Sequence, residues 1–202
     1  MSLDGRLEPE RPDTLHNRLE EYRVQELRGK VDAIVTSGAR VSEENPEFPV
    51  KDSMGKEPAI VIVDKNAELP PESDVLKNQS RKMILVTSRK ANRNRIKRIQ
   101  EKRPDIEVME LGEFAVNLED MLWELHRAGI RNLLLEGDVS LNMRMLDHNL
   151  VNEMYLLVAP LLLGEQEPSA FDGKLERKTH LQLEGILQFG DHVVLHYNIR
   201  KH

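Results

Sequence analysis

The 202-residue chain contains no cysteine, so it has no disulfide, no thiolate-bound zinc and no cysteine nucleophile. It also lacks any run of 18 apolar residues, and Asp4, Arg6 and Glu8 interrupt the pattern of a signal peptide. We therefore expect a cytoplasmic protein without a membrane partner. Because 39% of the residues are hydrophobic, the chain can bury a full core, and we predict a single domain over residues 1–202.

Aromatic residues are scarce, at 4%, and the strongly basic stretch of the chain contains none. Residues 89–103 hold eight Lys or Arg and one acid, although the net charge is −6. Such a run could bind nucleic acid, or it could be the solvated face of a helix. Because the remainder is strongly acidic and no aromatic side chain is available for stacking, we favour the helix face and do not expect nucleic acid as a partner.

Short aliphatic runs alternate with helical patterns along the first two thirds of the chain. Residues 31–37, 59–64 and 83–88 are rich in β-branched side chains and predict buried strands. Residues 117–129 predict a helix, with Asn117 as its cap and Gly129 at its end, and this helix leads into a strand at 132–137. This alternation is typical of an α/β fold.

The last third predicts a different arrangement. A second short helix is expected over about 139–148, and residues 153–164 form an apolar run that we expect to lie deep in the sheet, with Pro160 at a strand end. Residues 180–190 and 192–200 alternate and are divided by Gly190 and Asp191, which predicts an antiparallel hairpin at an edge. The fold class is therefore α/β, with a mixed, mostly parallel sheet flanked by helices.

The stretch "LLLEGDVSLN" (133–142) predicts a junction between a buried strand and a helix. Such a junction can present backbone N–H groups to a phosphate, although a glycine there can equally serve sterics alone. Glu136 is at the carboxyl end of the strand, where open α/β sheets place their ligands. Asp138, however, stands where an incoming anion would bind.

Seven histidines raise the question of a metal site. His192 and His196 share one face of a predicted strand, but four residues of strand separate them by roughly 13 Å, too far for one ion. No P-loop or catalytic triad pattern is present either. We therefore predict no metal.

Four segments together resemble one family: "SLDGR" at 2, "ELRGKVDAIVTSGARVSEENPEFPVK" at 26, "IVIVDKN" at 60, and "GIRNLLLEGDVSLNMRMLDHNLVNEMYLLVAPLLLG" at 129. The chain is similar to the reductase of riboflavin biosynthesis, a dihydrofolate-reductase-like domain that occurs alone or fused to a zinc deaminase. The resemblance implies NADPH-dependent reduction of the ribosyl side chain of a ribosylaminopyrimidine 5′-phosphate to the ribityl form. It also implies a dihydrofolate-reductase-like sheet and a homodimer.

The resemblance implies site residues at matching positions. Substrate binding falls on Arg28, Phe48, Lys51 and Glu136, and Asp4 is a candidate for proton handling beside Glu136 at the catalytic site. Cofactor binding falls on a larger set that approaches the ribose phosphate and pyrophosphate of NADPH: Arg40, Glu44, Lys65, Gly137, Asp138, Val139, Ser140, Leu141 and Asn142.

Two of these positions depart from the family in a related way. Relatives commonly have Thr at Arg40 and a second glycine at Asp138. A carboxylate within about 4 Å of a phosphate costs about 1 to 4 kcal/mol. We therefore hypothesise that Arg40 compensates, either by pairing with Asp138 or by supplying the pyrophosphate with a cation.

The start of the chain departs as well, because relatives reach "SLDG" at the end of a central strand and here Met1 directly precedes it. We expect that first central strand to be missing. We also expect this chain to have lower stability or activity than a chain extended upstream. Two alternatives to the reductase remain open: a reductase of a pterin-like heterocycle in the same superfamily, and a decayed, non-catalytic homologue that serves as a binding partner.

Overall fold

The structure is a computed structural model that describes residues 1–7, 15–50 and 57–200, with the side chains of 15–21 also outside the description. The chain divides into two compact units, residues 23–138 and residues 1–22 with 139–202. Each unit is described by itself. The prediction of one domain over 1–202 stays a prediction.

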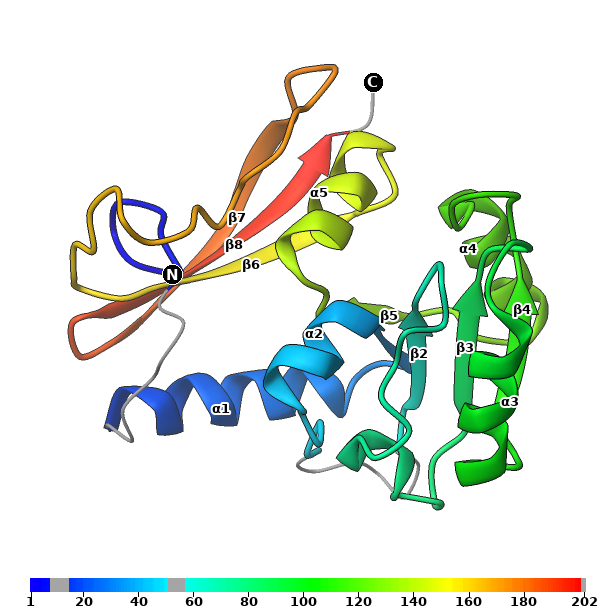
Figure 1. Ribbon diagram of the computed structural model, residues 1–202. Helices are drawn as coiled ribbons and strands as arrows, with labels where there is room; N and C mark the ends of the chain where they lie inside the picture. The colour runs from blue at the N-terminus through cyan, green and yellow to red at the C-terminus, as the bar shows by residue number, and fades with distance from the viewer. Residues whose placement is uncertain (8–14, 51–56, 201–202) are drawn as a thin grey trace. The chain divides into compact units, whose positions relative to one another are not determined.

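The unit of residues 23–138 is built on a five-stranded parallel sheet in the order β4-β3-β2-β1-β5 (Figure 1). Its strands are β1 (Ala33–Ser37), β2 (Ala59–Val63), β3 (Met83–Thr87), β4 (Glu107–Glu110) and β5 (Leu133–Leu135). Every residue of β1, β2 and β3 is buried, which explains their unbroken aliphatic sequences. The expected parallel α/β sheet is confirmed.

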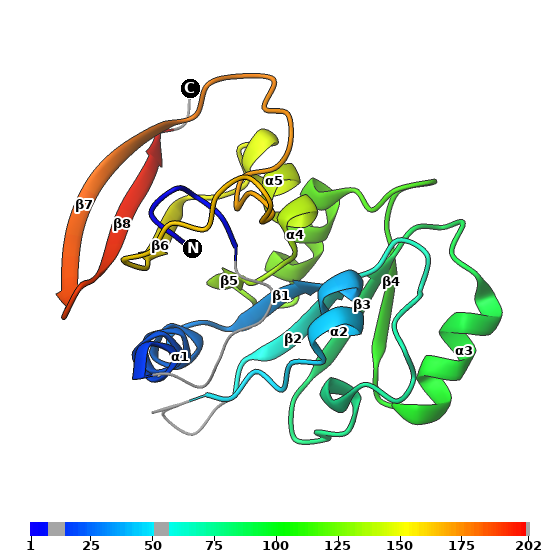
Figure 2. The same cartoon turned by 60° about the vertical axis from the view of Figure 1, so that its left-hand side comes forward.

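The helices of this unit connect its parallel strands, and the direction of each connection decides which face of the sheet the helix covers. Helix α2 (Gly38–Glu44) and helix α3 (Arg93–Lys102) follow β1 and β3, and the 3-10 helix η1 (Asp74–Leu76) follows β2. Helix α4 (Leu118–Arg127) carries the chain back from β4 to β5, on the other side of β1. Because such crossovers are right-handed, this reversal puts α4 on the face opposite α3, as Figure 2 shows.

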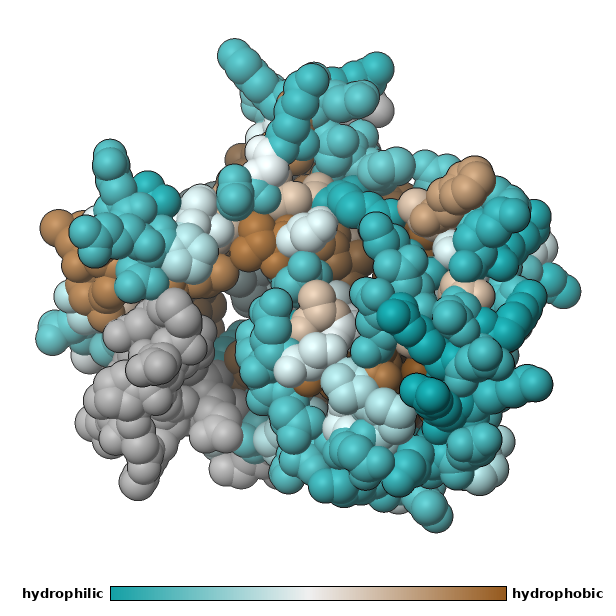
Figure 3. Space-filling view, viewed as in Figure 1, coloured by the Kyte–Doolittle hydropathy of each residue, from teal (hydrophilic) through white to brown (hydrophobic). Residues whose placement is uncertain are grey.

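Local sequence accounts for these helices. The Asn117 side chain accepts hydrogen bonds from the N–H groups of Glu119 and Asp120, so the predicted cap of α4 is confirmed. The basic stretch forms α3, where only Ile96 and Ile99 are buried and the surface is hydrophilic (Figure 3). This agrees with a solvated helix face.

The second unit contains a three-stranded antiparallel sheet in the order β6-β8-β7. Its elements are β6 (Glu153–Val158), β7 (His180–Phe189), β8 (His192–Arg200) and helix α5 (Val139–Asp147). The predicted hairpin β7-β8 is confirmed. The described residues thus form parallel and antiparallel ladders, and most of the strands are parallel, as expected.

The expected deep burial of residues 153–164 is wrong. Residues 154–158 of β6 are half-buried, and Leu162 beyond the strand is 72% exposed. The physical reason is that β8 is the one strand that pairs with β6 within the described residues, so β6 is an outer strand of the antiparallel sheet. At its other edge, Ser2 forms a parallel bridge with Ala159, and the Met1 amine donates to the carbonyl of Leu157 at 2.8 Å. The expectation of a missing strand stays a prediction.

Helix α1 (Leu15–Arg28) ends within the larger unit. Within the described part of the chain, no helix is both long and apolar enough to cross a membrane. The same residues include no group of three or more His, Cys, Asp or Glu placed to hold a metal ion.

Candidate active site

The larger unit has one point where the chain changes direction across its sheet. Strands β2, β3 and β4 extend from one side of β1, and β5 lies on the other. Ligands of open α/β sheets bind outside the carboxyl ends of the strands at such a switch point. The residues that follow β1 and β5 are therefore the first candidates for a site.

The two strand ends are joined by hydrogen bonds at this point. The Glu136 N–H donates to the carbonyl of Val35 at 2.8 Å, and the Thr36 hydroxyl donates to the Glu136 carbonyl at 2.9 Å. The Ser37 hydroxyl oxygen caps α2 by accepting from the N–H of Arg40, and it also accepts from the N–H of Asp138 at 3.3 Å. The backbone that carries Glu136 is thus held on several sides.

Glu136 is bound by the guanidinium of Arg28 in a two-point ion pair. The Nε and Nη2 atoms of Arg28 donate to the two carboxylate oxygens, each at 2.7 Å. The third nitrogen, Nη1, donates to the carbonyl of Pro49 at 3.1 Å. The two side chains are only 9% and 11% exposed, so this is a largely desolvated pair with fork-to-fork geometry. Arg28 therefore directs every guanidinium nitrogen to the protein itself.

Arg40 brings a second guanidinium to the same carboxyl-terminal edge. Its Nη1 donates to the Glu136 carbonyl at 2.7 Å and lies 3.5 Å from a Glu136 carboxylate oxygen, while its Nε donates to Glu44 at 2.9 Å. Asp138 is not among the hydrogen-bond or ion-pair partners of Arg40 in the described chain. The hypothesis of an Arg40–Asp138 pair is wrong for this structure, because Glu136 and Glu44 already bind that guanidinium.

Phe48 connects the two arginines. Its fully buried ring lies 5.3 Å from the Arg28 guanidinium carbon and 5.8 Å from that of Arg40, which is cation–π distance. Its backbone has φ +53°, a left-handed conformation that is costly for an aromatic residue. The structure thus brings together four of the predicted residues, Arg28, Phe48, Arg40 and Glu136, with Glu44 at their exposed side. Lys51 lies outside the described residues.

Lys65 lies apart from this cluster, at the carboxyl end of β2. The preceding residue, Asp64, is buried and accepts from the N–H groups of Asn66 and Leu69 at 3.2 and 2.7 Å. Burial raises the pKa of the Asp64 carboxyl. A Cβ on Gly38 would lie 2.7 Å from that carboxyl group, so any other residue at the start of α2 would force the Asp64 side chain to shift. Sequence reasoning missed Asp64, although its place after a buried strand was a usable signal.

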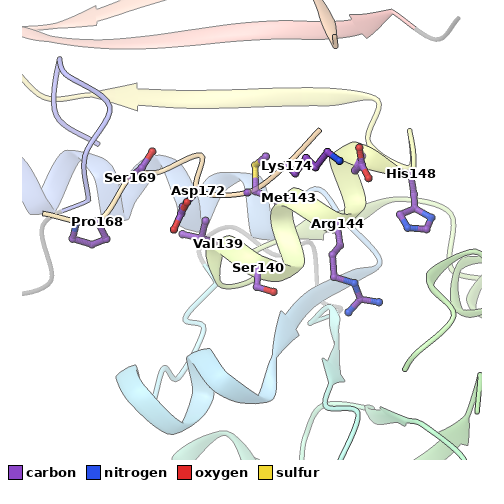
Figure 4. A pocket seen from close by; sticks show the side chains of 11 residues that line it. Val139, Ser140, Met143, Arg144, His148, Pro168, Ser169, Asp172 and Lys174 are labelled. Atoms are coloured by element: carbon purple, nitrogen blue, oxygen red, sulfur yellow. The ribbon is translucent and has the colours of Figure 1, made fainter. Parts of the chain in front are cut away.

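The second unit carries the rest of the predicted cofactor stretch, at the start of α5. A cavity of about 420 Å³ lies between α5 and residues 168–174, and Val139 and Ser140 line it (Figure 4). Its lining also includes Arg144 and Lys174 together with Asp147 and Asp172. The roles of Gly137, Asp138 and residues 139–142 in cofactor binding stay predictions.

The hydrogen bonds of Asp4 give this residue a structural role. Its carboxylate accepts hydrogen bonds from the Ser2 hydroxyl at 2.5 Å and from the Gly164 and Leu163 N–H groups at 2.8 and 3.2 Å. These donors, the Ser2 hydroxyl first, lower the pKa of Asp4 to about 2. The ionised carboxylate thus ties two loops together, and the proton-handling role of Asp4 stays a prediction.

Comparison with known proteins places these observations in a family. The family model of the RibD C-terminal domain matches residues 1–195 of this chain. The chain is 31% identical to a protein of Archaeoglobus fulgidus over 86% of this chain and 83% of that one, and 29% identical to one of Methanothermobacter thermautotrophicus over 99% and 95%. Both relatives are named 2,5-diamino-6-ribosylamino-4(3H)-pyrimidinone 5′-phosphate reductase.

Solved structures agree on the fold. RibD of Acinetobacter baumannii superimposes with a TM-score of 0.77 at 21% identity, over 98% of this chain and 55% of that chain. A pyrimidine reductase-like protein of Corynebacterium diphtheriae gives a TM-score of 0.81 at 19% identity, over 100% and 90%. At these identities the likeness concerns the fold alone.

Proposed function

Because the chain belongs to the family of the RibD C-terminal domain, we propose that it is a reductase of riboflavin biosynthesis that acts on 2,5-diamino-6-ribosylamino-4(3H)-pyrimidinone 5′-phosphate. The observation that carries the proposal is the carboxylate of Glu136, oriented by two guanidiniums at the switch point of the sheet. A diaminopyrimidinone presents N–H donors, for which a carboxylate is a matching acceptor.

The two arginines of the cluster have different contacts and therefore different proposed roles. Arg28 uses all three nitrogens internally, so it orients and neutralises Glu136. Arg40 is 22% exposed, and its Nη2 has no hydrogen-bond partner among the described residues. Arg40 is therefore the guanidinium of this pair that is better placed to contact an anionic group of a ligand, whereas Arg28 reaches one only by giving up part of its pair with Glu136.

The cofactor of this reaction is proposed to be NADPH, which supplies a hydride to C1′ of the ribosyl group when bound. The chemistry of the chain fits a phosphorylated cofactor, because Lys65 is an exposed cation that follows a buried strand at the carboxyl edge. Lys65 would bind the phosphate on the adenosine ribose, and Arg40 would face the pyrophosphate. A cation at each position contributes affinity only for an anionic group.

A homodimer is also proposed, supported by one face of the antiparallel sheet. Leu181, Leu183 and Ile186 of β7 are between 41% and 58% exposed. They stand opposite Ile199, Tyr197 and Leu195 in register, so they share that face. A contiguous apolar strand on a surface is a common site of association.

The dimer has a direct test. Replacing Leu183 and Ile186 together by Glu should convert a dimer to monomers in sedimentation velocity, while a Glu184→Gln variant on the same strand should not. A chain that sediments as a monomer without any substitution would disprove the dimer.

The activity is tested by following oxidation of NADPH in the presence of the pyrimidinone phosphate. Glu136→Gln keeps the size of the side chain but replaces one acceptor oxygen by a donor, and we expect kcat/KM to fall roughly tenfold to a hundredfold. Glu119→Gln, on the exposed first turn of α4, is the matched control and should match the unsubstituted protein. A folded chain that oxidises neither NADPH nor NADH with this substrate would refute the proposed function.

A further inference from the structure

The turn at Phe48 is held by two arginines. The Phe48 backbone is left-handed, with φ +53°, and a bulky residue keeps this conformation only where its surroundings enforce it. The Nη1 atom of Arg81 donates to the Phe48 carbonyl at 2.7 Å. The next carbonyl, of Pro49, accepts from Nη1 of Arg28 at 3.1 Å. Hydrogen bonds to consecutive carbonyls therefore fix the turn, and with it the direction of the buried Phe48 ring.

Arg81 is itself firmly held by the protein. Its side chain is 5% exposed, and its Nε and Nη2 atoms donate to the carboxylate of Glu57 at 2.8 and 3.4 Å. The Arg81 hydrogen bond is the main cause that lowers the pKa of Glu57, so this counter-ion is ionised near neutral pH. The backbone carbonyl of Arg81 accepts from the fully buried guanidinium of Arg103 at 2.5 Å. The fold thus sets the position of Arg81 before any ligand binds.

The Phe48 ring connects Arg81 to the proposed acceptor of the substrate. The ring lies at cation–π distance from the guanidiniums of Arg28 and Arg40, and both guanidiniums contact the Glu136 carboxylate. Within the described residues, the Arg81 side chain makes no hydrogen bond or ion pair with Glu136. Any effect of Arg81 on Glu136 must therefore pass through Phe48.

We propose that Arg81 is a positioning residue of the pyrimidinone site, which holds Phe48 in its left-handed conformation so that the ring keeps both guanidiniums against Glu136. This inference rests on the proposed function and adds to it a residue that acts through another side chain. Without Arg81, the Phe48 carbonyl loses its buried donor, and the turn can relax toward an ordinary φ and displace the ring. The orientation of Glu136 is then less well defined, and binding of the pyrimidinone should weaken more than the chemical step.

Steady-state kinetics with the pyrimidinone phosphate and NADPH test this role, together with the melting temperature of each variant. Arg81→Met should raise the KM for the pyrimidinone phosphate about tenfold and change kcat by less than about twofold. Arg81→Lys retains one charged donor and should give an intermediate KM, and this variant carries the test if Arg81→Met does not fold. Glu57→Gln is the matched control. It leaves an acceptor for the Arg81 Nε and the bond to Phe48, so it should lower the melting temperature and leave KM unchanged.

A double-mutant cycle shows whether Arg81 acts through the ring. Phe48→Leu removes the ring, and in that background Arg81→Met should raise KM by less than about twofold further. A second rise of about tenfold there, or an unchanged KM in a folded Arg81 variant, would overturn the inference while the reductase proposal stands. An equally large rise in KM for Glu57→Gln would also overturn it, because it would indicate a general effect of lost stability. If the unsubstituted chain does not reduce the pyrimidinone phosphate, the proposed function itself fails and the inference falls with it.

Discussion

Replacing Arg28 by methionine removes both hydrogen bonds that the Glu136 carboxylate receives from one guanidinium. The two bonds are 2.7 Å long, and the side chains are 9% and 11% exposed, so little water can take the place of the lost donors. Methionine keeps an unbranched apolar side chain of similar length without the guanidinium. The change therefore isolates the electrostatic part of the pair.

Removing one partner of a buried ion pair costs about 3 to 5 kcal/mol, because the other charge stays desolvated. Here Arg40 remains 3.5 Å from the same carboxylate, which favours the lower end of that range. We expect the free energy of unfolding to fall by about 3 kcal/mol. For a chain of this length the melting temperature should fall by roughly 6 to 12 °C.

Thermal denaturation followed by circular dichroism measures the effect, with Arg127→Met as the control. The Arg127–Glu124 pair is exposed, at 3.4 Å, and its loss should cost less than about 1 kcal/mol. Adding Glu136→Gln to Arg28→Met removes the stranded charge, and about half of the lost stability should return. The reasoning would be refuted if Arg28→Met melted at the same temperature as the control. It would also be refuted if the double variant lost as much stability as the two single variants lost together.

Three further predictions concern other parts of the chain. Gly38→Ala places a Cβ 2.7 Å from the Asp64 carboxyl and should cost about 1 to 3 kcal/mol in urea denaturation, whereas Gly185→Ala, with no heavy atom within 4 Å, should be nearly neutral. Asn117→Ala removes the cap of α4 and should cost about 1 kcal/mol in the same assay, and an unchanged midpoint would contradict the capping role. Because the pKa of Asp4 is lowered from 3.8 to about 2, its contribution to stability is present above about pH 4 and is lost as the pH falls toward 2. Melting curves of Asp4→Asn should accordingly show a smaller decline of stability over that interval, and a parallel decline would argue against the hydrogen bonds to Ser2 and Gly164.

Much of the local structure could be read from the chain alone. The cap at Asn117 and the apolar stripe that follows predict α4 because both signals act within one helix. The aliphatic runs predict β1, β2 and β3, since a strand buried on both faces must be apolar throughout. The same rule misjudged β6, whose apolar sequence does not reveal how many neighbours the strand has.

The sequence by itself determined the buried strands β1, β2 and β3, helix α4 with its cap, the hairpin and the place of Glu136 at the end of a strand, because these depend on neighbours within a few residues. Only the tertiary structure decided which charges meet. It brings Arg28, from the end of α1, onto a carboxylate 108 positions away, and directs Arg40 to Glu136 and Glu44 instead of Asp138. Pairing of charges depends on distance in space and on burial, and neither quantity can be read from spacing along the chain.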